Sequence, residues 1–311
     1  MSCDLCPRLC HIDRHVQRGF CGCDDTMRIA RIGLHRYEEP CICGDGGSGA
    51  VFFSGCNLRC VFCQNKVLQT GKVGQAFTPE ALAAAMLELE CIGAQNINLV
   101  TPTPHVNGIL RALDMARNDG LSLPIVYNTN GYLSVDTVDK LKYHVDIWLP
   151  DFKYHDQRLA DRFSSAPRYF ETALAAIGRM LEVSGQLDLD ESGRAKKGVL
   201  IRHLVLPACV FDTRDVLSAI KTHFGTDTYL SLMHQFTPQP DGKAPLNRRL
   251  TKREYESAVN ACLDMGFTRV YIQDALSATF AYTPDFSNEV SVQACSCSTY
   301  RSRNQATPSS L

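Results

Sequence analysis

Short apolar runs alternate with amphipathic segments along most of this chain. The runs are bounded by glycine, proline or polar residues and predict strands at residues 50–54, 97–100, 125–127, 145–149, 199–206, 229–233 and 269–273. The segments between them place apolar residues on one helical face and predict helices at residues 78–93, 106–118, 135–143, 168–183, 214–223 and 252–265. The first of these helices has a clear start signal, with Thr78 as the cap, Pro79 at the first helical position and Glu80 in the first turn.

This alternation predicts the fold class and the division of the chain. Strands that alternate with helices of this length are typical of parallel strands joined by crossover helices, and seven strands fit a partial or near-complete (β/α) barrel better than a doubly wound sheet. We therefore expect an α/β barrel over residues 49–275. Residues 1–48 are expected to be a cysteine-rich metal-binding segment without a core element, and the polar residues 188–197 a solvated loop. Residues 276–311 are expected to be a partly disordered tail.

The composition excludes several classes of protein. The 311 residues are 45% hydrophobic and 21% charged, which is ordinary for a globular chain. The 32 basic residues nearly balance the 33 acidic ones, so no overall field attracts a polyanion, and nucleic acid is not an expected partner. No apolar run is long enough for an ordinary transmembrane helix, and the first residues lack the basic and apolar regions of a secretory signal. We expect a cytoplasmic protein without a membrane partner.

Cysteine is the unusual residue of this sequence. The chain has 15 cysteines, an odd number, and most of them lie within the first 63 residues. Disulfide frameworks are typical of small secreted chains that cannot build a sufficient core. This chain shows no secretory signal and is long enough to build a large core. The cysteines therefore favour metal binding or catalysis over disulfide bonds.

The densest chemical signal is a C-x3-C-x2-C loop formed by Cys56, Cys60 and Cys63, directly after the first predicted strand. Cysteine thiolates hold iron–sulfur clusters, and three of them leave one iron of a four-iron cluster open to bind a substrate. A structural zinc site completed by a fourth cysteine is the alternative. The loop is expected at the C-terminal mouth of a barrel, where catalytic residues lie, and this position favours the cluster.

A second group of cysteines lies at the N-terminus. Cys3, Cys6, Cys10 and Cys21, with Cys23 nearby, have the number and compactness needed for a second metal site. Zinc and a second iron–sulfur cluster both fit this spacing, and thiols without a metal are the remaining alternative. Cys295 and Cys297 have no assigned role.

The cysteine loop resembles the signature of the radical S-adenosylmethionine (SAM) superfamily, in which an aromatic residue, here Phe62, precedes the last cysteine. More narrowly, the chain is similar to the pyruvate formate-lyase-activating-enzyme-like iron–sulfur proteins from Cys3 to about Asp274. Besides the cysteine loop, the resemblance is carried by segments at residues 3–8, 38–40, 47–49, 52–54, 99–103, 127–131, 149–153 and 201–207.

This resemblance implies a barrel of the radical SAM type and a set of site residues. Cys56, Cys60 and Cys63 would ligate a [4Fe–4S] cluster whose fourth iron binds the amine and carboxylate of SAM. The further residues implied to contact SAM are Thr101, Thr103, Asn128, Thr129, Asp151, Lys153, Arg202 and Gln235.

Three positions depart from the activating enzymes. Residues 101–103 replace their Gly-Gly-Glu segment, which meets the methionine amine, so hydroxyl groups or backbone carbonyls must substitute. Asn128, beside Thr129, stands where they carry an aspartate. Gln235 is nearest in sequence to their late histidine that faces the cofactor.

Several residues also have purely structural interpretations. Asp151 and Lys153 lie two apart in an extended segment and face the same side, which fits a surface ion pair as well as a site at a strand's C-terminal end. Arg202 fits a salt bridge as well as a cofactor contact. His105 and His203 are expected to be hydrogen-bonded structural residues.

The function that these features favour is that of a radical SAM oxidoreductase. Such an enzyme takes one electron, from flavodoxin or ferredoxin for example, cleaves SAM to methionine and a 5′-deoxyadenosyl radical, and abstracts hydrogen. The resemblance to activating enzymes favours a glycine of a partner protein, a glycyl radical enzyme, as the hydrogen donor. The alternatives are a radical SAM enzyme that acts on a small molecule or makes another peptide modification, and a non-catalytic iron–sulfur or metal-binding protein.

Overall fold

The structure, a computed structural model, describes residues 3–273, 284–286 and 290. Most of the predicted tail, including Cys295 and Cys297, lies outside the described residues. The strands are β1 (Arg28–His35), β2 (Ser48–Phe53), β3 (Gln75–Ala76), β4 (Ile97–Val100), β5 (Ile125–Thr129), β6 (Ile147–Pro150), β7 (Asp188–Leu189), β8 (Ala195–Leu204), β9 (Tyr229–Met233) and β10 (Val270–Ile272).

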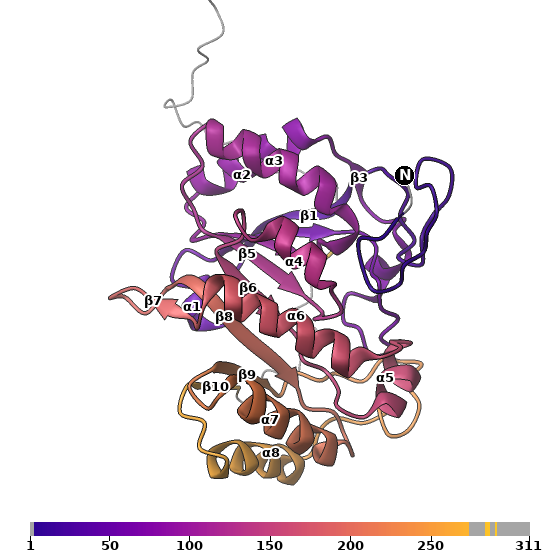
Figure 1. The fold of residues 1–311 in the computed structure, drawn as a ribbon, viewed down its shortest axis with the longest axis vertical. Helices are drawn as coiled ribbons and strands as arrows, with labels where there is room; N and C mark the ends of the chain where they lie inside the picture. Colours follow the sequence, from indigo (N-terminus) through magenta and orange to yellow (C-terminus); the bar gives the residue numbers. More distant parts are fainter. Residues whose placement is uncertain (1–2, 274–283, 287–289, 291–311) are drawn as a thin grey trace, which may run out of the picture.

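The helices connect successive strands. They are α1 (Pro40–Cys43), α2 (Pro79–Cys91), α3 (Val106–Asn118), α4 (Val135–Leu141), α5 (Gln157–Ser164), α6 (Tyr169–Ser184), α7 (Val210–Phe224) and α8 (Lys252–Asp264), with 3₁₀ turns η1 (Lys66–Thr70) and η2 (Thr103–His105). At one end of the molecule α2 packs against α3, and at the other end α7 packs against α8 (Figure 1). Within the described ranges no helix has both the length and the apolar character needed to cross a membrane.

The strands form one mostly parallel sheet in the order β10-β9-β8-β6-β5-β4-β2-β1-β3, with β7 paired to β8. Neighbours from β2 to β10 run parallel, whereas β1 is antiparallel to both β2 and β3. The order is linear, so the sheet is a barrel that does not close. This confirms the predicted fold class, a partial (β/α) barrel.

Helix starts agree with the sequence signals. The Thr78 side chain accepts a hydrogen bond from the backbone N–H of Ala81, and Pro79 occupies the first turn of α2. Strand β4, helix α3 and strand β9 have the bounds that the hydrophobic pattern predicts.

The expectation that residues 1–48 contain no core element is wrong. Strand β1 lies in this segment, and Ile29, Ala30 and Ile32 on it are buried. A register shift between Ile29 and Arg31 breaks the strict alternation of apolar and polar residues that reveals a strand in sequence.

Two other segments also differ from the prediction. Part of the polar stretch 188–197 is a hairpin of β7 and the start of β8 instead of a loop. Helix α5 has no counterpart in the prediction because it is only 8 residues long, and its buried positions are limited to Ala160, Phe163 and Ser164.

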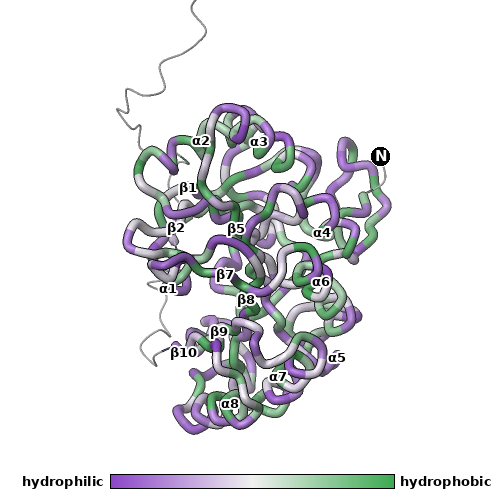
Figure 2. The backbone as a smooth tube through the Cα atoms, turned by 60° about the vertical axis from the view of Figure 1, so that its left-hand side comes forward, coloured by the Kyte–Doolittle hydropathy of each residue, from purple (hydrophilic) through white to green (hydrophobic). Residues whose placement is uncertain are grey.

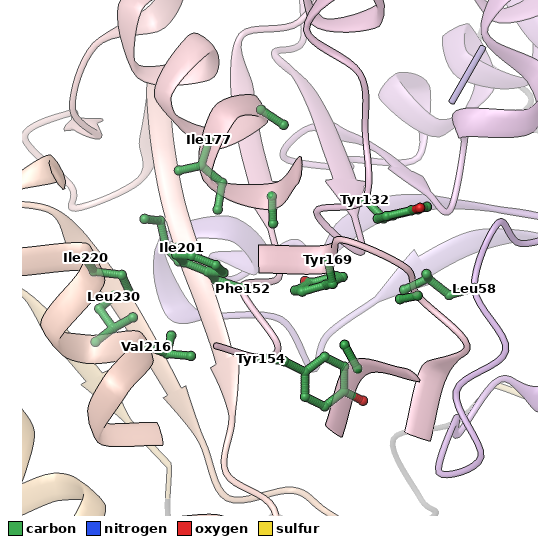
Figure 3. Packing of buried hydrophobic residues seen from close by; sticks show 14 of the residues in the cluster. Leu58, Tyr132, Phe152, Tyr154, Tyr169, Ile177, Ile201, Val216, Ile220 and Leu230 are labelled. Carbon is green, nitrogen blue, oxygen red and sulfur yellow. The ribbon is translucent and has the colours of Figure 1, made fainter. Parts of the chain in front are cut away.

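The main hydrophobic core extends from the sheet to the cysteine loop. Trp148 and Tyr127 are fully buried, and the indole N–H of Trp148 donates to the Ser184 hydroxyl at 2.9 Å. In Figure 3, Leu58 of the cysteine loop belongs to the same cluster as Tyr132 and Tyr169. Along the tube in Figure 2, the green of apolar residues marks much of β5 and β8 inside the molecule. The core thus holds the cysteine loop on a rigid support.

Candidate functional site

The cysteine loop follows β2 directly and is fixed by backbone hydrogen bonds. The chain turns at Gly55, whose φ is 94°. Beyond this turn, the N–H groups of Arg59 and Val61 donate to the carbonyls of Ser164 and Phe163 at 2.9 and 2.8 Å. The loop is therefore clamped to the end of α5.

Polar groups point at two of the three loop thiols. The amide of Asn130 donates to Sγ of Cys56 at 3.5 Å, and the hydroxyl of Ser164 donates to Sγ of Cys60 at 3.0 Å. The backbone N–H of Leu58 donates to Sγ of Cys56 at 3.4 Å. Hydrogen bonds to cluster sulfurs tune the properties of iron–sulfur centres.

The three thiols are buried and close enough to interact. Burial raises the pKa of Cys56 to about 11 and that of Cys63 to about 12, and the neighbouring Cys60 adds to both shifts. Burial also raises the pKa of Cys60. The thiols carry their protons at neutral pH, so metal binding must displace these protons.

The three cysteines line a central cavity of about 230 Å³ at the C-terminal ends of the parallel strands. Most of the residues that the resemblance implies for SAM contact line the same cavity: Thr101, Asn128, Thr129, Asp151, Lys153, Arg202 and Gln235. Thr103 is not among the lining residues. It is buried, and its hydroxyl pairs with the hydroxyl of Tyr127 at 3.3 Å, so its contact with SAM stays a prediction.

Asp151 and Lys153 form an ion pair within the cavity wall instead of a surface pair. Nζ of Lys153 lies 2.5 Å from Oδ2 of Asp151, and the side chains are 14% and 21% exposed. Burial alone would lower the pKa of Lys153, but Asp151 and Cys60 raise it above its ordinary value. The ammonium group therefore stays charged beside the cysteine loop.

Arg202 forms the salt bridge that is one of its two interpretations from sequence, with partners that the sequence does not identify. Its guanidinium group binds the carboxylates of Glu38 and Glu39, and its Nε lies 2.9 Å from Oε1 of Glu39. The amide of Asn98 donates to Oε1 of Glu38 at 2.9 Å. Glu38 also lines the cavity. The sequence signal for this role was the adjacent carboxylates before Pro40, in a stretch otherwise assigned to the N-terminal segment.

The two histidines expected to be structural are confirmed as hydrogen-bonded and buried. Nε2 of His105 lies 2.8 Å from the carbonyl oxygen of Ser54. The ring of His203 bonds the carbonyl of Phe152 at 2.7 Å and the hydroxyl of Thr213 at 3.0 Å.

The N-terminal cysteines lie beside the cysteine loop. A methyl group at Gly19 would lie 3.5 Å from Sγ of Cys21 and 3.6 Å from Sγ of Cys10. Burial raises the pKa of Cys6 to about 11, and the nearby Cys21 and Cys10 add to this shift. Every cysteine in the described residues is a free thiol.

The cavity fits a cluster and SAM. Three convergent thiols supply ligands for three irons. The hydroxyl oxygen of Thr129 is buried in the cavity wall and has no hydrogen-bond partner within the described part of the chain. A buried polar group without a partner is expected where a ligand supplies the missing hydrogen bond. The described residues include no group of three or more His, Cys, Asp or Glu side chains arranged to hold a single metal ion.

A backbone contact supports the position of Asp151. Gly131 has φ 77°, and a Cβ atom there would lie 2.1 Å from the carbonyl oxygen of Asp151. Gly185 has the same φ, but a Cβ there would meet none of the described residues within 4 Å.

The Gly185→Ala variant should therefore lose about 1–3 kcal/mol of unfolding free energy from backbone strain alone. We expect Gly131→Ala to lose clearly more, because the backbone of Asp151 must also move. Urea denaturation of both variants measures the difference. Equal losses would show that the contact between residues 131 and 151 carries no constraint.

Comparison with known proteins agrees with this geometry. Residues 50–186 match the model of the Radical SAM superfamily. An uncharacterized protein of Methanocaldococcus jannaschii is 28% identical over 285 residues, which cover 87% of this chain and 77% of that protein.

Two solved structures show the same fold at low identity. The first, native anSMEcpe with bound AdoMet, is 15% identical with a TM-score of 0.51 over 71% of this chain. The second, the FeFe-hydrogenase maturase HydG from Carboxydothermus hydrogenoformans, is 14% identical with a TM-score of 0.50 over 70% of this chain. The matches span only 61% and 50% of those two proteins. Residues 50–186 of this chain, which include the cysteine loop, are thus a radical SAM domain.

Proposed function

We propose that this chain is a glycyl-radical-enzyme activase, a radical SAM oxidoreductase that abstracts hydrogen from a glycine of a partner protein. The radical SAM domain at residues 50–186 implies an enzyme with a [4Fe–4S] cluster and SAM. The observation that carries the proposal is the single cavity shared by the loop thiols and the Asp151–Lys153 ion pair at the C-terminal ends of the strands. When bound, the cluster and SAM supply a 5′-deoxyadenosyl radical.

In that reaction, the residues of this chain bind and orient the cluster and SAM. Cys56, Cys60 and Cys63 hold the cluster. The unpartnered hydroxyl of Thr129 is free to donate a hydrogen bond to SAM. The ion-paired Lys153 keeps a positive charge beside the loop, where it attracts the negatively charged thiolates. Burial of the cavity wall limits the access of water to a reactive radical.

The open sheet supports a peptide as the substrate. Because the strand order is linear, the barrel is not closed by its own strands, and a loop of another protein can enter at the open side. A glycine is chemically suitable, since its Cα radical is delocalised over two flanking amides. The reductant in this proposal is a protein of the flavodoxin or ferredoxin class.

The second candidate is a radical SAM enzyme with a small-molecule substrate. Two features of this chain favour it. Residues 101–103 differ from the activating enzymes, and the cavity extends to Glu38 and Arg202, which give it a charged wall suited to a polar ligand.

Isotope transfer tests the proposal most directly. A candidate glycyl radical enzyme is produced with deuterated glycine and mixed anaerobically with the reconstituted chain, dithionite and SAM. We expect deuterium in the 5′-deoxyadenosine and a glycyl doublet in the electron paramagnetic resonance spectrum. Both signals should vanish when the acceptor glycine of the partner is changed to alanine.

Two other outcomes separate the alternatives. SAM cleavage without deuterium transfer or a glycyl signal, with every glycyl radical enzyme of the source organism, would contradict the activase and favour a small-molecule substrate. Absence of any 5′-deoxyadenosine from protein that carries a full cluster would favour a non-catalytic metal-binding protein.

A further inference from the structure

The N-terminal segment is part of the site instead of a separate appendage. The backbone N–H of Cys56 donates to the carbonyl of Cys21 at 3.2 Å. The Arg8 side chain donates to the carbonyl of Asn57 at 2.9 Å, and that of Arg59 donates to the carbonyl of Phe20. Both guanidinium groups also stack on the ring of Phe20, at 3.7 and 4.4 Å from its centroid. The two cysteine segments are thus clamped together from both sides.

Two of the N-terminal thiols lie close to each other beside Gly19. A Cβ atom at Gly19 would lie 3.5 Å from Sγ of Cys21 and 3.6 Å from Sγ of Cys10, and the backbone N–H of Phe20 donates to Sγ of Cys10 at 3.5 Å. Backbone hydrogen bonds join Cys3 to residues 11 and 12, which closes the loop that carries Cys6 and Cys10. The spacing C-x2-C-x3-C from Cys3 to Cys10 is the reverse of the spacing in the radical SAM loop.

A short chain of contacts links the two groups of sulfur atoms. Asn57 follows Cys56 in sequence, and its side chain hydrogen-bonds Cys6. The amide of Asn130 donates both to Oδ1 of Asn57 at 2.8 Å and to Sγ of Cys56 at 3.5 Å. Only two amide side chains separate the thiol of Cys6 from that of Cys56.

We propose that Cys6, Cys10 and Cys21, with Cys3 as the fourth ligand, hold a second [4Fe–4S] cluster that delivers the electron to the radical SAM cluster. One electron passes from an external one-electron reductant to the N-terminal centre and from there to the cluster at Cys56. No bond forms or breaks in this step, and no proton moves. The delivery role rests on the proposed function, whereas the metal site does not.

The number of thiols fits a [4Fe–4S] cluster, which takes four cysteine ligands, one for each iron. The N-terminal segment supplies four, at positions 3, 6, 10 and 21. Cys6, Cys10 and Cys21 are all partly exposed, which gives a protein reductant access to this centre.

Iron analysis of reconstituted protein tests the metal site. The intact chain should bind about eight irons, and the Cys56→Ala/Cys60→Ala/Cys63→Ala variant should keep about four of them as a [4Fe–4S] cluster by Mössbauer spectroscopy. The Cys6→Ala/Cys10→Ala/Cys21→Ala variant should likewise bind about four irons, and SAM should still change the electron paramagnetic resonance signal of its remaining cluster. A Cys209→Ala variant controls for the loss of a cysteine elsewhere.

The variant that lacks the radical SAM thiols decides the question even if the N-terminal variant does not fold. If that variant bound no iron, or bound zinc in place of iron, the proposal of a second cluster would be overturned. The delivery role has its own measurement, the rate at which reduced flavodoxin reduces the radical SAM cluster. This rate should fall in the N-terminal variant, while reduction by excess dithionite should still go to completion. An unchanged rate would overturn delivery, and absence of SAM cleavage in all proteins would count against the proposed function alone.

Discussion

Changing Cys60 to alanine should abolish the reductive cleavage of SAM. Cys60 is 8% exposed, and its sulfur accepts a hydrogen bond from Ser164 within the cavity wall. Removal of the thiol would leave one iron of the proposed cluster without a protein ligand, and no other described cysteine besides Cys56 and Cys63 lines the cavity to replace it. The measurement is 5′-deoxyadenosine formed with dithionite, which should fall below detection.

Cys209 supplies a matched control for this prediction. It is also 8% exposed, but it lies at the start of α7 and does not line the cavity. The Cys209→Ala variant should keep both its iron content and its cleavage activity. Undiminished cleavage by the Cys60→Ala variant would refute the assignment of the cluster to this loop.

Changing Arg202 to methionine should cause a large loss of unfolding free energy. The substitution keeps an elongated side chain but leaves the carboxylates of Glu38 and Glu39 buried without their cation. Breaking a buried ion pair in this way costs about 3–5 kcal/mol, because an uncompensated charge stays behind. Urea denaturation at neutral pH should show a loss of this size.

The pH dependence of this loss identifies its cause. Burial raises the pKa of Glu39, but Arg202 more than offsets this and holds the pKa below its ordinary value. In the wild type, Glu39 therefore adds stability above its unfolded pKa of about 4.3, and this stability is lost as the pH falls through the folded pKa. Without Arg202, burial raises the folded pKa instead, so the variant should regain part of its lost stability as the pH falls toward 4.3.

A surface arginine with two carboxylate partners gives the control. Arg179 binds Asp139 at 2.6 Å and Glu182 at 2.8 Å, but its side chain is 30% exposed. The Arg179→Met variant should lose at most about 1 kcal/mol, because solvent screens such pairs. If both variants lost the same stability with the same pH dependence, burial of the Arg202 cluster would not be the cause.

The features that the sequence predicts well are local. The cysteine spacing identifies the loop, because its three thiols lie within eight residues of each other. The start of α2 at Thr78 follows from a cap and a proline that act on adjacent backbone groups. Strand β4 and helix α3 have clear periodicity, and both are placed correctly.

The features that the sequence does not reveal depend on distant contacts. Glu39 is 163 positions from Arg202, and hydrophobic periodicity carries no information about such a pair. Thr103 follows a strand, as catalytic residues of barrels do, but the adjacent strand places the hydroxyl of Tyr127 within its reach. The pattern of strand β1 is disturbed by a register shift, so hydrophobic alternation does not reveal this strand.

The distance between Arg202 and its partners along the chain also has a consequence for biosynthesis. Glu39 leaves the ribosome 163 residues before Arg202, which at the usual speed of translation is roughly 10–30 s. During this time the first strands are complete, but the carboxylates of Glu38 and Glu39 have no arginine to neutralise them. The carboxylates in this part of the barrel wall must therefore stay hydrated in the nascent chain. Water can leave them only after β8 has been synthesised and Arg202 can pair with them.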